Sequence, residues 1–478
     1  AGYGEMAASY LQEGNLQKAK QYARKSLDFN RYNINAWESM AICSRLLKQN
    51  ADAQQATEAI LDIDPLNHFA YYEQYLMDSS VKRKANFMDR HRSEFPEQTF
   101  LELALSYYRK GQVQTAKELL QLAPQQALIK LWVAFLDQDS KALAAIGTSD
   151  PNFIFPYRRE SLDALEWALQ YSDHWTIKYY LALNYWAKDR MEEAISLLKS
   201  CGQTPDYAPF YLSRAHLLES VLHENPENDL LKALNLSKSD WRVQRIVGQH
   251  LTATGRHKAA LDHLEKAYSR HKDNYAIGMD YVRQLVHAGQ YETAIAILGK
   301  LEVLPFEGAS EGRQLHEQAH IGAALKAMDA SQWQTAIKSL QVAKEWPERL
   351  GVGKPYTPEE RLSDFLLALC HSQLGNKEES TALHQKVWQR TKGTAGRLSN
   401  YHVLGMLSYQ VLDLGQKETV APLSLQALKQ HDHPDVQWIM ANYDRQLQDL
   451  KVLQHRFPDR WKSVNMQLLQ RAIDLARR

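Results

Sequence analysis

Residues 314–322 read QLHEQAHIG and contain His316, Glu317 and His320 at the spacing H-E-x-x-H. On a helix, two histidines four positions apart lie on one face, where their imidazole nitrogens can bind Zn²⁺. The glutamate between them can then act as the general base that activates a zinc-bound water. These three residues raise the hypothesis of a zinc hydrolase. Whether this hypothesis holds depends on the helices or strands that would position the three side chains.

The composition of the 478-residue chain is that of an ordered protein, with 44% hydrophobic and 24% charged residues. The formal net charge is only +1, so no overall field attracts nucleic acid or an anionic membrane surface. No apolar run is long enough to span a bilayer. The three cysteines, Cys43, Cys201 and Cys370, form no CxxC pair, and we expect them to be buried free thiols.

The chain is built from an internal repeat of 34 residues. Leu, Ala, Gln, Glu and Lys dominate at helical spacing, and strand-like alternation is almost absent. Several residue pairs keep the same interval of 34: Tyr3/Trp37, Trp37/Tyr71, Ala7/Ala41, Ala19/Ala53, Arg31/Pro65, Leu251/Leu285, Gly255/Gly289, Ala260/Ala294 and Leu264/Leu298. One structural unit therefore recurs along the chain.

Each unit reads as a helix, a short turn with Gly, a second helix and then Pro, as in residues 103–124. A bulky residue early in the first helix is expected to pack on the neighbouring hairpin. Ala at the closest helix crossing lets the two backbones approach, and Gly permits the turn conformation. Pro ends the second helix because it cannot continue the hydrogen-bond ladder.

This pattern resembles the tetratricopeptide repeat over most of the chain. The resemblance implies an all-α fold, a right-handed α-solenoid (superhelix) of helical hairpins with a C-terminal helical cap. Weaker copies occupy residues 324–347, 366–388 and 407–430. The expected organisation is tetratricopeptide-like repeats at 1–80, a linker or short helix at 81–98, further repeats at 99–239 with an irregular Pro/aromatic insert near 149–160, repeats at 240–434, and capping helices at 435–478.

A narrower resemblance rests on the strings LDIDPLNHFAYYEQYL (61–76), DPNFIFPYRRESLDALEWAL (150–169) and WTIKYYLALNYW (175–186). These are similar to the helical C-terminal region of bacterial proteins that carry the domain of unknown function 5107. The resemblance implies a preceding β-rich, carbohydrate-enzyme-like domain. The start at Ala1, which lacks an initiator Met, agrees with a truncated piece of such a protein. The compartment stays open, with the cytoplasm favoured because the chain shows neither a signal peptide nor a disulfide pattern.

The repeat frame gives the H-E-x-x-H residues a structural role. His320 lies sixteen positions before Ala336, where other repeats have a bulky ring before the crossing Ala: Tyr3, Trp37 and Phe100. We therefore interpret His320 as a packing residue, with His316 at or near the helix start and Glu317 in the first turn. The downstream H-x-x-G-x-x-H extension is missing. We expect that the two histidines do not face each other in an open pocket, and we predict no metal and no cofactor.

The prediction is thus a non-catalytic scaffold for protein–protein docking or for docking of its own upstream domain. One alternative is a glycan-associated module of a carbohydrate-active protein, and a lesser one is the zinc hydrolase. The first helices of tetratricopeptide repeats line a concave binding face. The residues expected on that face are Tyr108, Tyr179, Trp186, Gln249, Arg283 and His287. Aromatic side chains exposed on the face would favour glycan binding, and aromatic side chains buried between hairpins would favour docking.

Overall fold

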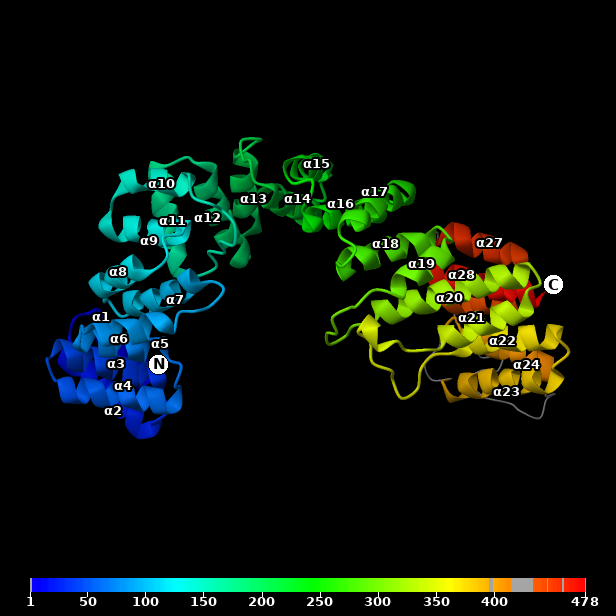
Figure 1. The fold of residues 1–478 in the computed structure, drawn as a ribbon, viewed down its shortest axis with the longest axis horizontal. Coiled ribbons are helices and arrows are strands. Elements are labelled where there is room, and N and C mark those ends of the chain that lie inside the picture. Colours follow the sequence, from blue (N-terminus) through cyan, green and yellow to red (C-terminus); the bar gives the residue numbers. More distant parts are fainter. Residues whose placement is uncertain (1, 395–398, 414–432, 445, 458–459, 478) are drawn as a thin grey trace. The chain divides into compact units, whose positions relative to one another are not determined.

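The computed structural model describes residues 2–394, 399–413, 433–444, 446–457 and 460–477. The chain divides into two compact units, residues 1–236 and 237–478, which are described here one at a time. All regular structure in the described ranges is helical, and consecutive helices pair into hairpins that stack along each unit (Figure 1). The predicted all-α solenoid of helical hairpins is confirmed.

The first unit contains fifteen α-helices and one 3₁₀ helix among its described residues. They are α1 (Tyr3–Gln12), α2 (Leu16–Phe29), α3 (Ile34–Leu46), α4 (Asn50–Ile63), α5 (His68–Met77), α6 (Val81–Asp89), α7 (Pro96–Arg109), α8 (Val113–Leu122), α9 (Ala127–Asp137), η1 (Ser140–Leu143), α10 (Ala144–Gly147), α11 (Glu160–Tyr171), α12 (Trp175–Ala187), α13 (Met191–Ser200), α14 (Ala208–Leu222) and α15 (Glu227–Leu236).

The second unit also consists of helical hairpins, and it contains one helix that packs against helices far earlier in the sequence. Its described helices are α16 (Trp241–Ala253), α17 (His257–Arg270), α18 (Tyr275–His287), α19 (Tyr291–Leu298), α20 (Glu311–Asp329), α21 (Trp333–Ala343), η2 (Glu348–Leu350), α22 (Arg361–Gln373), α23 (Lys377–Gly393), α24 (His402–Leu412), α26 (Pro434–Tyr443), α27 (Leu447–Arg456) and α28 (Val464–Ala476). Most of the repeat predicted at 407–430 lies outside the described residues.

The two helices of a hairpin cross at an alanine, as the repeat pattern predicts. Each has at most 1% of its surface exposed: Ala19, Ala53, Ala116, Ala194, Ala260, Ala294 and Ala336. A side chain larger than a methyl group at these crossings would push the paired helices apart. The small residue is therefore what allows the first and second helix of each hairpin to pack closely.

The turn inside each hairpin needs one residue in the left-handed backbone region. Glycine supplies it in several hairpins, for example Gly255 with φ +73° and Gly289 with φ +69°. Ser331 occupies the same place between α20 and α21 with φ +57°. A side chain in this conformation brings Cβ close to the following carbonyl oxygen, which is why Gly recurs there.

The bulky residue early in the first helix has a second role besides packing. Trp37 Nε1 donates a hydrogen bond to the carbonyl oxygen of Arg31 at 2.8 Å, and the Tyr71 hydroxyl donates to that of Pro65 at 3.0 Å. Both links span six residues and join the start of a first helix to the loop before it. They give a reason for a ring with a hydrogen-bond donor at positions 37 and 71; the acceptors are backbone carbonyls, which any residue supplies.

The predicted irregular insert runs between α10 and α11 without helix over residues 148–159. Its extended chain is held by side chains from two helices. Asn184 on α12 donates to the carbonyl oxygens of Pro156 and Arg158, and Arg158 pairs with Glu102 on α7. The prolines therefore mark a chain segment that is fixed in place by side-chain contacts.

Helix α28 does not extend the stack of hairpins. It packs against α20 and α22, far earlier in the sequence (Figure 1). Leu468, Leu469, Ala472 and Ile473 on α28 belong to the same hydrophobic cluster as residues of α20 to α24 and α26. Helix α28 thus covers first helices of preceding repeats.

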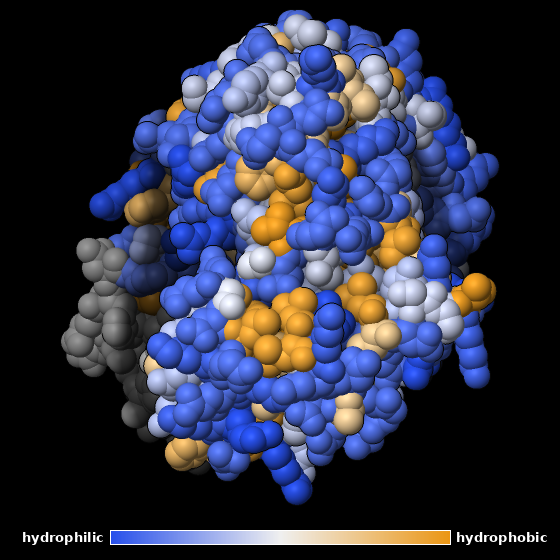
Figure 2. Space-filling model, turned by 90° about the vertical axis from the view of Figure 1, so that its left-hand side faces the viewer, coloured by the Kyte–Doolittle hydropathy of each residue, from blue (hydrophilic) through white to orange (hydrophobic). Residues whose placement is uncertain are grey.

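The surface in Figure 2 is covered mainly by hydrophilic side chains, with hydrophobic ones gathered in small groups between them. No helix among the described residues combines the length and the apolar character that a membrane span requires. Cys43, Cys201 and Cys370 are buried free thiols, as the sequence predicted. Burial raises the pKa of the Cys43 and Cys370 thiols to about 12, which makes both poor nucleophiles near neutral pH.

Candidate protein-binding surface

The H-E-x-x-H residues lie in the middle of α20. The ring centroids of His316 and His320 are 4.6 Å apart, as the i, i+4 spacing on one helical face implies. His316 is only 2% exposed, and its Nε2 donates to the carbonyl oxygen of Val342 at 2.9 Å. That hydrogen bond uses one of the two nitrogens through which His316 could bind a metal.

The start of this helix was predicted too late in the sequence. Helix α20 begins at Glu311, so His316 lies in its second turn and Glu317 is not a first-turn acid. Tertiary packing supports the extra turn: a Cβ added to Gly312 would lie 2.4 Å from the Leu350 carbonyl oxygen. Arg313 stacks its guanidinium 4.6 Å from the Trp346 ring. The contacts of Gly312 with Leu350 and of Arg313 with Trp346 thus stabilise the first turn of α20.

Burial shifts the pKa values of His320 and Glu317. It lowers the pKa of His320 to about 4, with the neighbouring His316 and Arg313 adding to the effect. It raises the pKa of the Glu317 carboxyl to about 7, although Arg313 at 3.4 Å acts in the opposite direction. Among the described residues, no three His, Cys, Asp or Glu side chains are arranged to hold a metal ion. That this helix binds no zinc stays a prediction.

The three aromatic residues predicted on the concave face are packed against neighbours. Tyr179 is 5% exposed, and its hydroxyl lies 3.4 Å from Ser213 Oγ. The half-buried ring of Tyr108 meets Trp132 edge-on, with centroids 5.2 Å apart. The half-buried Trp186 stacks on His216 at 5.5 Å. These rings contribute mainly to contacts between hairpins.

The three polar residues predicted on the concave face belong to successive first helices of the second unit. Gln249 lies on α16, and Arg283 and His287 lie one turn apart on α18. Gln249 Nε2 donates to Asp280 Oδ2 at 3.2 Å, and Arg283 Nη1 donates to Asp280 Oδ1 at 2.7 Å. The exposed His287 stacks on His257 of α17, with ring centroids 3.8 Å apart. The structure thus brings Gln249 and Arg283 together through Asp280.

Three residues that sequence reasoning missed complete this group. Asp280 is 1% exposed and also accepts a hydrogen bond from Arg245 Nε on α16 at 2.8 Å. Arg283 continues to Glu311 at the start of α20, with its Nε 2.9 Å from Oε1. We call Arg245, Gln249, Asp280, Arg283 and Glu311 the polar ladder. It joins α16, α18 and α20 in series.

The charges of the polar ladder stabilise one another. Burial alone would lower the pKa of Arg283, but the carboxylates of Asp280 and Glu311 outweigh it and raise that pKa. The side chains of Arg245 and Arg283 keep 38% and 34% of their surface exposed, whereas Asp280 is enclosed. The ladder therefore presents partly exposed cations that are oriented by a buried anion.

The first unit carries a comparable arrangement at its first helices. Lys110 on α7 donates from Nζ to Glu38 Oε2 on α3 at 2.7 Å and to Ser106 Oγ at 2.9 Å. Arg45 on α3 pairs with the fully buried Glu73 on α5, which also accepts from the Tyr107 hydroxyl at 2.9 Å. These cations are more buried than those of the polar ladder, so the pairs serve chiefly to join neighbouring hairpins.

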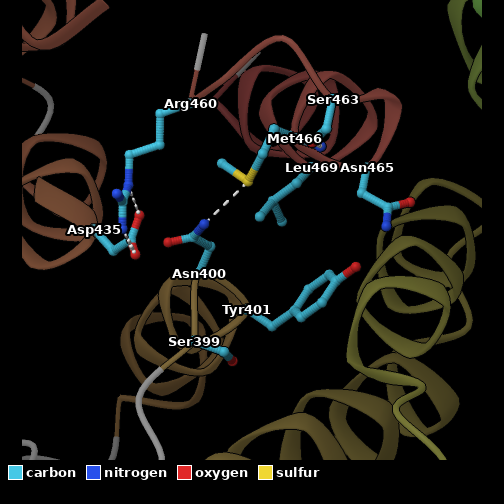
Figure 3. Close-up of a pocket in the computed structure, with 9 residues that line it drawn as sticks. All are labelled: Ser399, Asn400, Tyr401, Asp435, Arg460, Ser463, Asn465, Met466 and Leu469. Carbon is cyan, nitrogen blue, oxygen red and sulfur yellow. Dashed lines mark hydrogen bonds and ion pairs between the residues drawn. The ribbon is translucent and has the colours of Figure 1, made fainter. Parts of the chain in front are cut away.

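A cavity of about 420 Å³ lies where α28 meets the starts of α24 and α26 (Figure 3). Asp435 and Arg460 form one wall through two hydrogen bonds of 2.9 and 2.6 Å. Tyr401 and Asn465 lie on the opposite side, and Asn400 donates to Met466 Sδ at 3.1 Å. The cavity combines polar groups with the apolar side chains of the first turns of α28.

Three segments of the chain match family models of the tetratricopeptide repeat: residues 2–33, 98–126 and 251–302. The first two cover the hairpins α1–α2 and α7–α8, and the third runs from the end of α16 to α19, so each unit contains at least one segment that matches this repeat. No comparison confirms the narrower similarity to proteins with domain of unknown function 5107, which stays a hypothesis. No curated protein matches the sequence.

Solved structures that match this chain include PilW, described as a widely conserved type IV pilus biogenesis factor. It has 17% identity and a TM-score of 0.27, covering 45% of this chain and 93% of PilW. The Naa15/Naa10 complex bound to HypK-THB has 11% identity and a TM-score of 0.28, covering 99% and 90%. Yeast Tom70 has 11% identity and a TM-score of 0.26, covering 96% of each chain.

Proposed function

We propose that this chain, which contains tetratricopeptide repeats in both of its units, is a non-catalytic scaffold that binds a partner protein through the polar ladder. Arrays of this kind generally serve protein–protein interaction. The observation that carries the proposal is the set of contacts from Arg245 and Arg283 to the enclosed carboxylate of Asp280. It supplies a row of oriented, partly exposed donors on two successive first helices, α16 and α18.

The chemistry of this row suits a polypeptide ligand. Guanidinium and amide groups donate to the carbonyl oxygens of an extended chain and to the carboxylates of Asp and Glu. Asp280 holds the guanidinium groups of Arg245 and Arg283 in place, which lowers the entropy that binding would otherwise cost. The partner segment that fits best is therefore extended, with at least one acidic side chain to meet the exposed part of Arg245 or Arg283.

Glycan binding has less support. A sugar-stacking platform needs an aromatic face open to solvent, and Tyr179 is 5% exposed among other rings. Tyr108 and Trp186 each use a ring contact with a neighbouring side chain. Rings that pack against neighbouring side chains, one buried and two half-buried, favour docking over glycan binding.

A domain of the same polypeptide upstream of Ala1, related to carbohydrate enzymes, is one partner that the sequence resemblance suggests. The proposal includes it as a hypothesis. Co-expression of this chain with the upstream segment of its gene, as separate polypeptides, would test the idea. Co-purification that Arg245→Glu abolishes would support it, and the absence of any association would count against it.

The general proposal is tested with photo-crosslinking side chains placed in the full chain inside its native host cells. We expect the amino acid at position 249, on the ladder, to give discrete crosslinked adducts with another polypeptide. The matched control is position 262, where Asp262 is exposed on α17, a second helix that carries no ladder residue. Equal crosslinking at both positions, or none at 249, would contradict the proposal.

A further inference from the structure

Helix α28 is amphipathic and is held mainly by its apolar side. Leu468, Leu469, Ala472 and Ile473 are at most 2% exposed, at the i, i+1, i+4, i+5 spacing of one helical face. Gln467 and Asp474 on the other side are exposed. The helix thus has the pattern of one that lies in a hydrophobic groove.

The groove is formed by first helices of the second unit. Helix α20 is buried nearly all round, and its Ile321, Leu325 and Met328 share one hydrophobic cluster with the apolar side chains of α28. Helix α22 forms the neighbouring wall, since α28 packs against both helices. A helix that is apolar nearly all round must be packed against other elements on every face, and α28 packs against one face of α20.

Polar contacts at the two ends set the direction of α28 in the groove. Gln318 Nε2 donates to Asn465 Oδ1 at 2.8 Å, across 147 residues of sequence. Near the other end Arg471 pairs with Asp329, and both side chains are more than a third exposed. Exposed pairs of this kind add specificity and little stability. The contacts therefore select one orientation of α28 in the groove.

The first turns of α28 border a surface pocket of about 420 Å³, which Asn465, Met466 and Leu469 line from this helix (Figure 3). Asn465 and Met466 are partly exposed, whereas Leu469 is buried. Water in the pocket can reach the first turn of the helix, and segments with solvent-exposed contacts open at a lower free energy than enclosed ones. We therefore expect local opening of α28 to begin at its N-terminal turns.

We propose that the groove of α20 and α22 is a helix-binding site and that α28 is its displaceable occupant. The partner that fits is an amphipathic helix of another protein with two apolar residue pairs four positions apart and a basic residue between them. That pattern is the one α28 presents, with Arg471 as the basic residue facing Asp329. The groove differs from the polar ladder, and this proposal does not depend on the function proposed above.

The test uses the full chain and a fluorescent peptide of residues 461–477 as the probe. In one variant Leu469→Asp and Ile473→Asp remove α28 from the groove. We expect this variant to bind the peptide at least about 100-fold more tightly than the unaltered chain, since the occupant must otherwise leave first. Equal binding by both chains would overturn the proposal, as would no binding by a variant whose circular dichroism is unchanged.

A charge exchange tests whether the peptide binds in the orientation of α28. Adding Asp329→Arg to the variant should weaken binding of the natural peptide about 10-fold, and a peptide with Arg471→Asp should restore it. The matched control is Glu292→Arg, because Glu292 is an exposed acid on α19. The same loss at both positions would show unspecific attraction and would overturn the proposal.

If the double variant does not fold, hydrogen exchange on the unaltered chain tests whether α28 can leave the groove. Backbone amides of residues 464–476 should exchange at least about 10-fold faster than those of 315–328, because local opening of α28 precedes unfolding of α20. Equal protection of the two segments would mean that α28 is an integral part of the core, and the proposal would be wrong.

Discussion

Arg245 on α16 and Asp280 on α18 are 35 residues apart, and Nε of the first lies 2.8 Å from Oδ2 of the second. The pair joins two consecutive repeats and is continued by Arg283 to Glu311 on α20. No single hairpin contains this arrangement. The surface proposed for partner binding therefore exists only when the repeats are stacked.

The first prediction concerns the buried carboxylate of the ladder. Asp280 is 1% exposed, and replacing both cations, with Arg245→Met and Arg283→Met, leaves its carboxylate with only Gln249 as a polar-ladder partner. We expect the free energy of unfolding to fall by about 3 kcal/mol, because an uncompensated buried charge is costly. Urea unfolding followed by circular dichroism measures the change.

Adding Asp280→Asn to that double variant provides the control. A neutral amide removes the buried charge, so the triple variant should recover part of the lost stability. If the triple variant is no more stable than the double one, electrostatics do not hold the ladder together. Lys258→Met, at an exposed position on α17, should change stability by less than about 0.5 kcal/mol.

The second prediction concerns the turn between α18 and α19. A Cβ added at Gly289 would meet nothing within 4 Å, so Gly289→Ala tests only the cost of φ +69° for an L-residue. We expect a loss of about 1 kcal/mol. At the equivalent turn, Ser331→Gly should gain about 0.5 kcal/mol, because relief of strain exceeds the added chain entropy. Changes of the same sign in both variants would refute this account of the turns.

The third prediction concerns the pH dependence of stability at Glu317. The folded protein keeps the proton of this carboxyl up to about pH 7, and an unfolded glutamate releases it near 4.5. Between these values the folded state binds more protons, so stability falls as the pH rises. Glu317→Gln should therefore match the wild type near pH 4 and be more stable by about 2 kcal/mol at pH 8.

Unfolding free energies at pH 4, 6 and 8 would measure this difference. Glu265→Gln, at an exposed position on α17, is the matched control and should change stability by less than about 0.5 kcal/mol at each pH. A Glu317→Gln variant whose advantage does not grow with pH would show that the carboxyl is not held protonated by burial.

The fourth prediction concerns metal content. We expect elemental analysis of the purified chain to find no stoichiometric zinc. His316 Nε2 is hydrogen bonded to the Val342 carbonyl, and the neighbouring imidazole of His320 is half-buried. One zinc per chain that disappears on His316→Ala would contradict this and would revive the zinc-hydrolase hypothesis.

Residues under steric constraint were predictable from the sequence. Ala at the crossing and Gly at the turn recur every 34 residues because close backbone approach and a left-handed φ exclude most other side chains. The period thus revealed Ala260, Ala294 and Gly289 before any contact was known. The hairpins and their repetition follow from these positions.

The contacts that make the candidate surface carry no such signal. Carboxylates occur on most of the helices, so only the stacking of α16 on α18 distinguishes Asp280 from the others. The packing of α28 against α20 could not be predicted from the sequence either, because the contacting residues Gln318 and Asn465 are 147 residues apart. The start of α20 was misplaced because it depends on packing of Gly312 against Leu350. Each of these features depends on tertiary contacts, which the repeat pattern does not encode.

The central claim is that the polar ladder binds a partner protein, and affinity for the partner captured at position 249 tests it most directly. Titration calorimetry should show that Arg245→Glu with Arg283→Glu weakens binding of that purified partner at least about 10-fold. Lys258→Glu with Lys266→Glu, at exposed positions on α17, should leave affinity unchanged within about twofold. Equal affinity for the wild type and the ladder variant would contradict the claim.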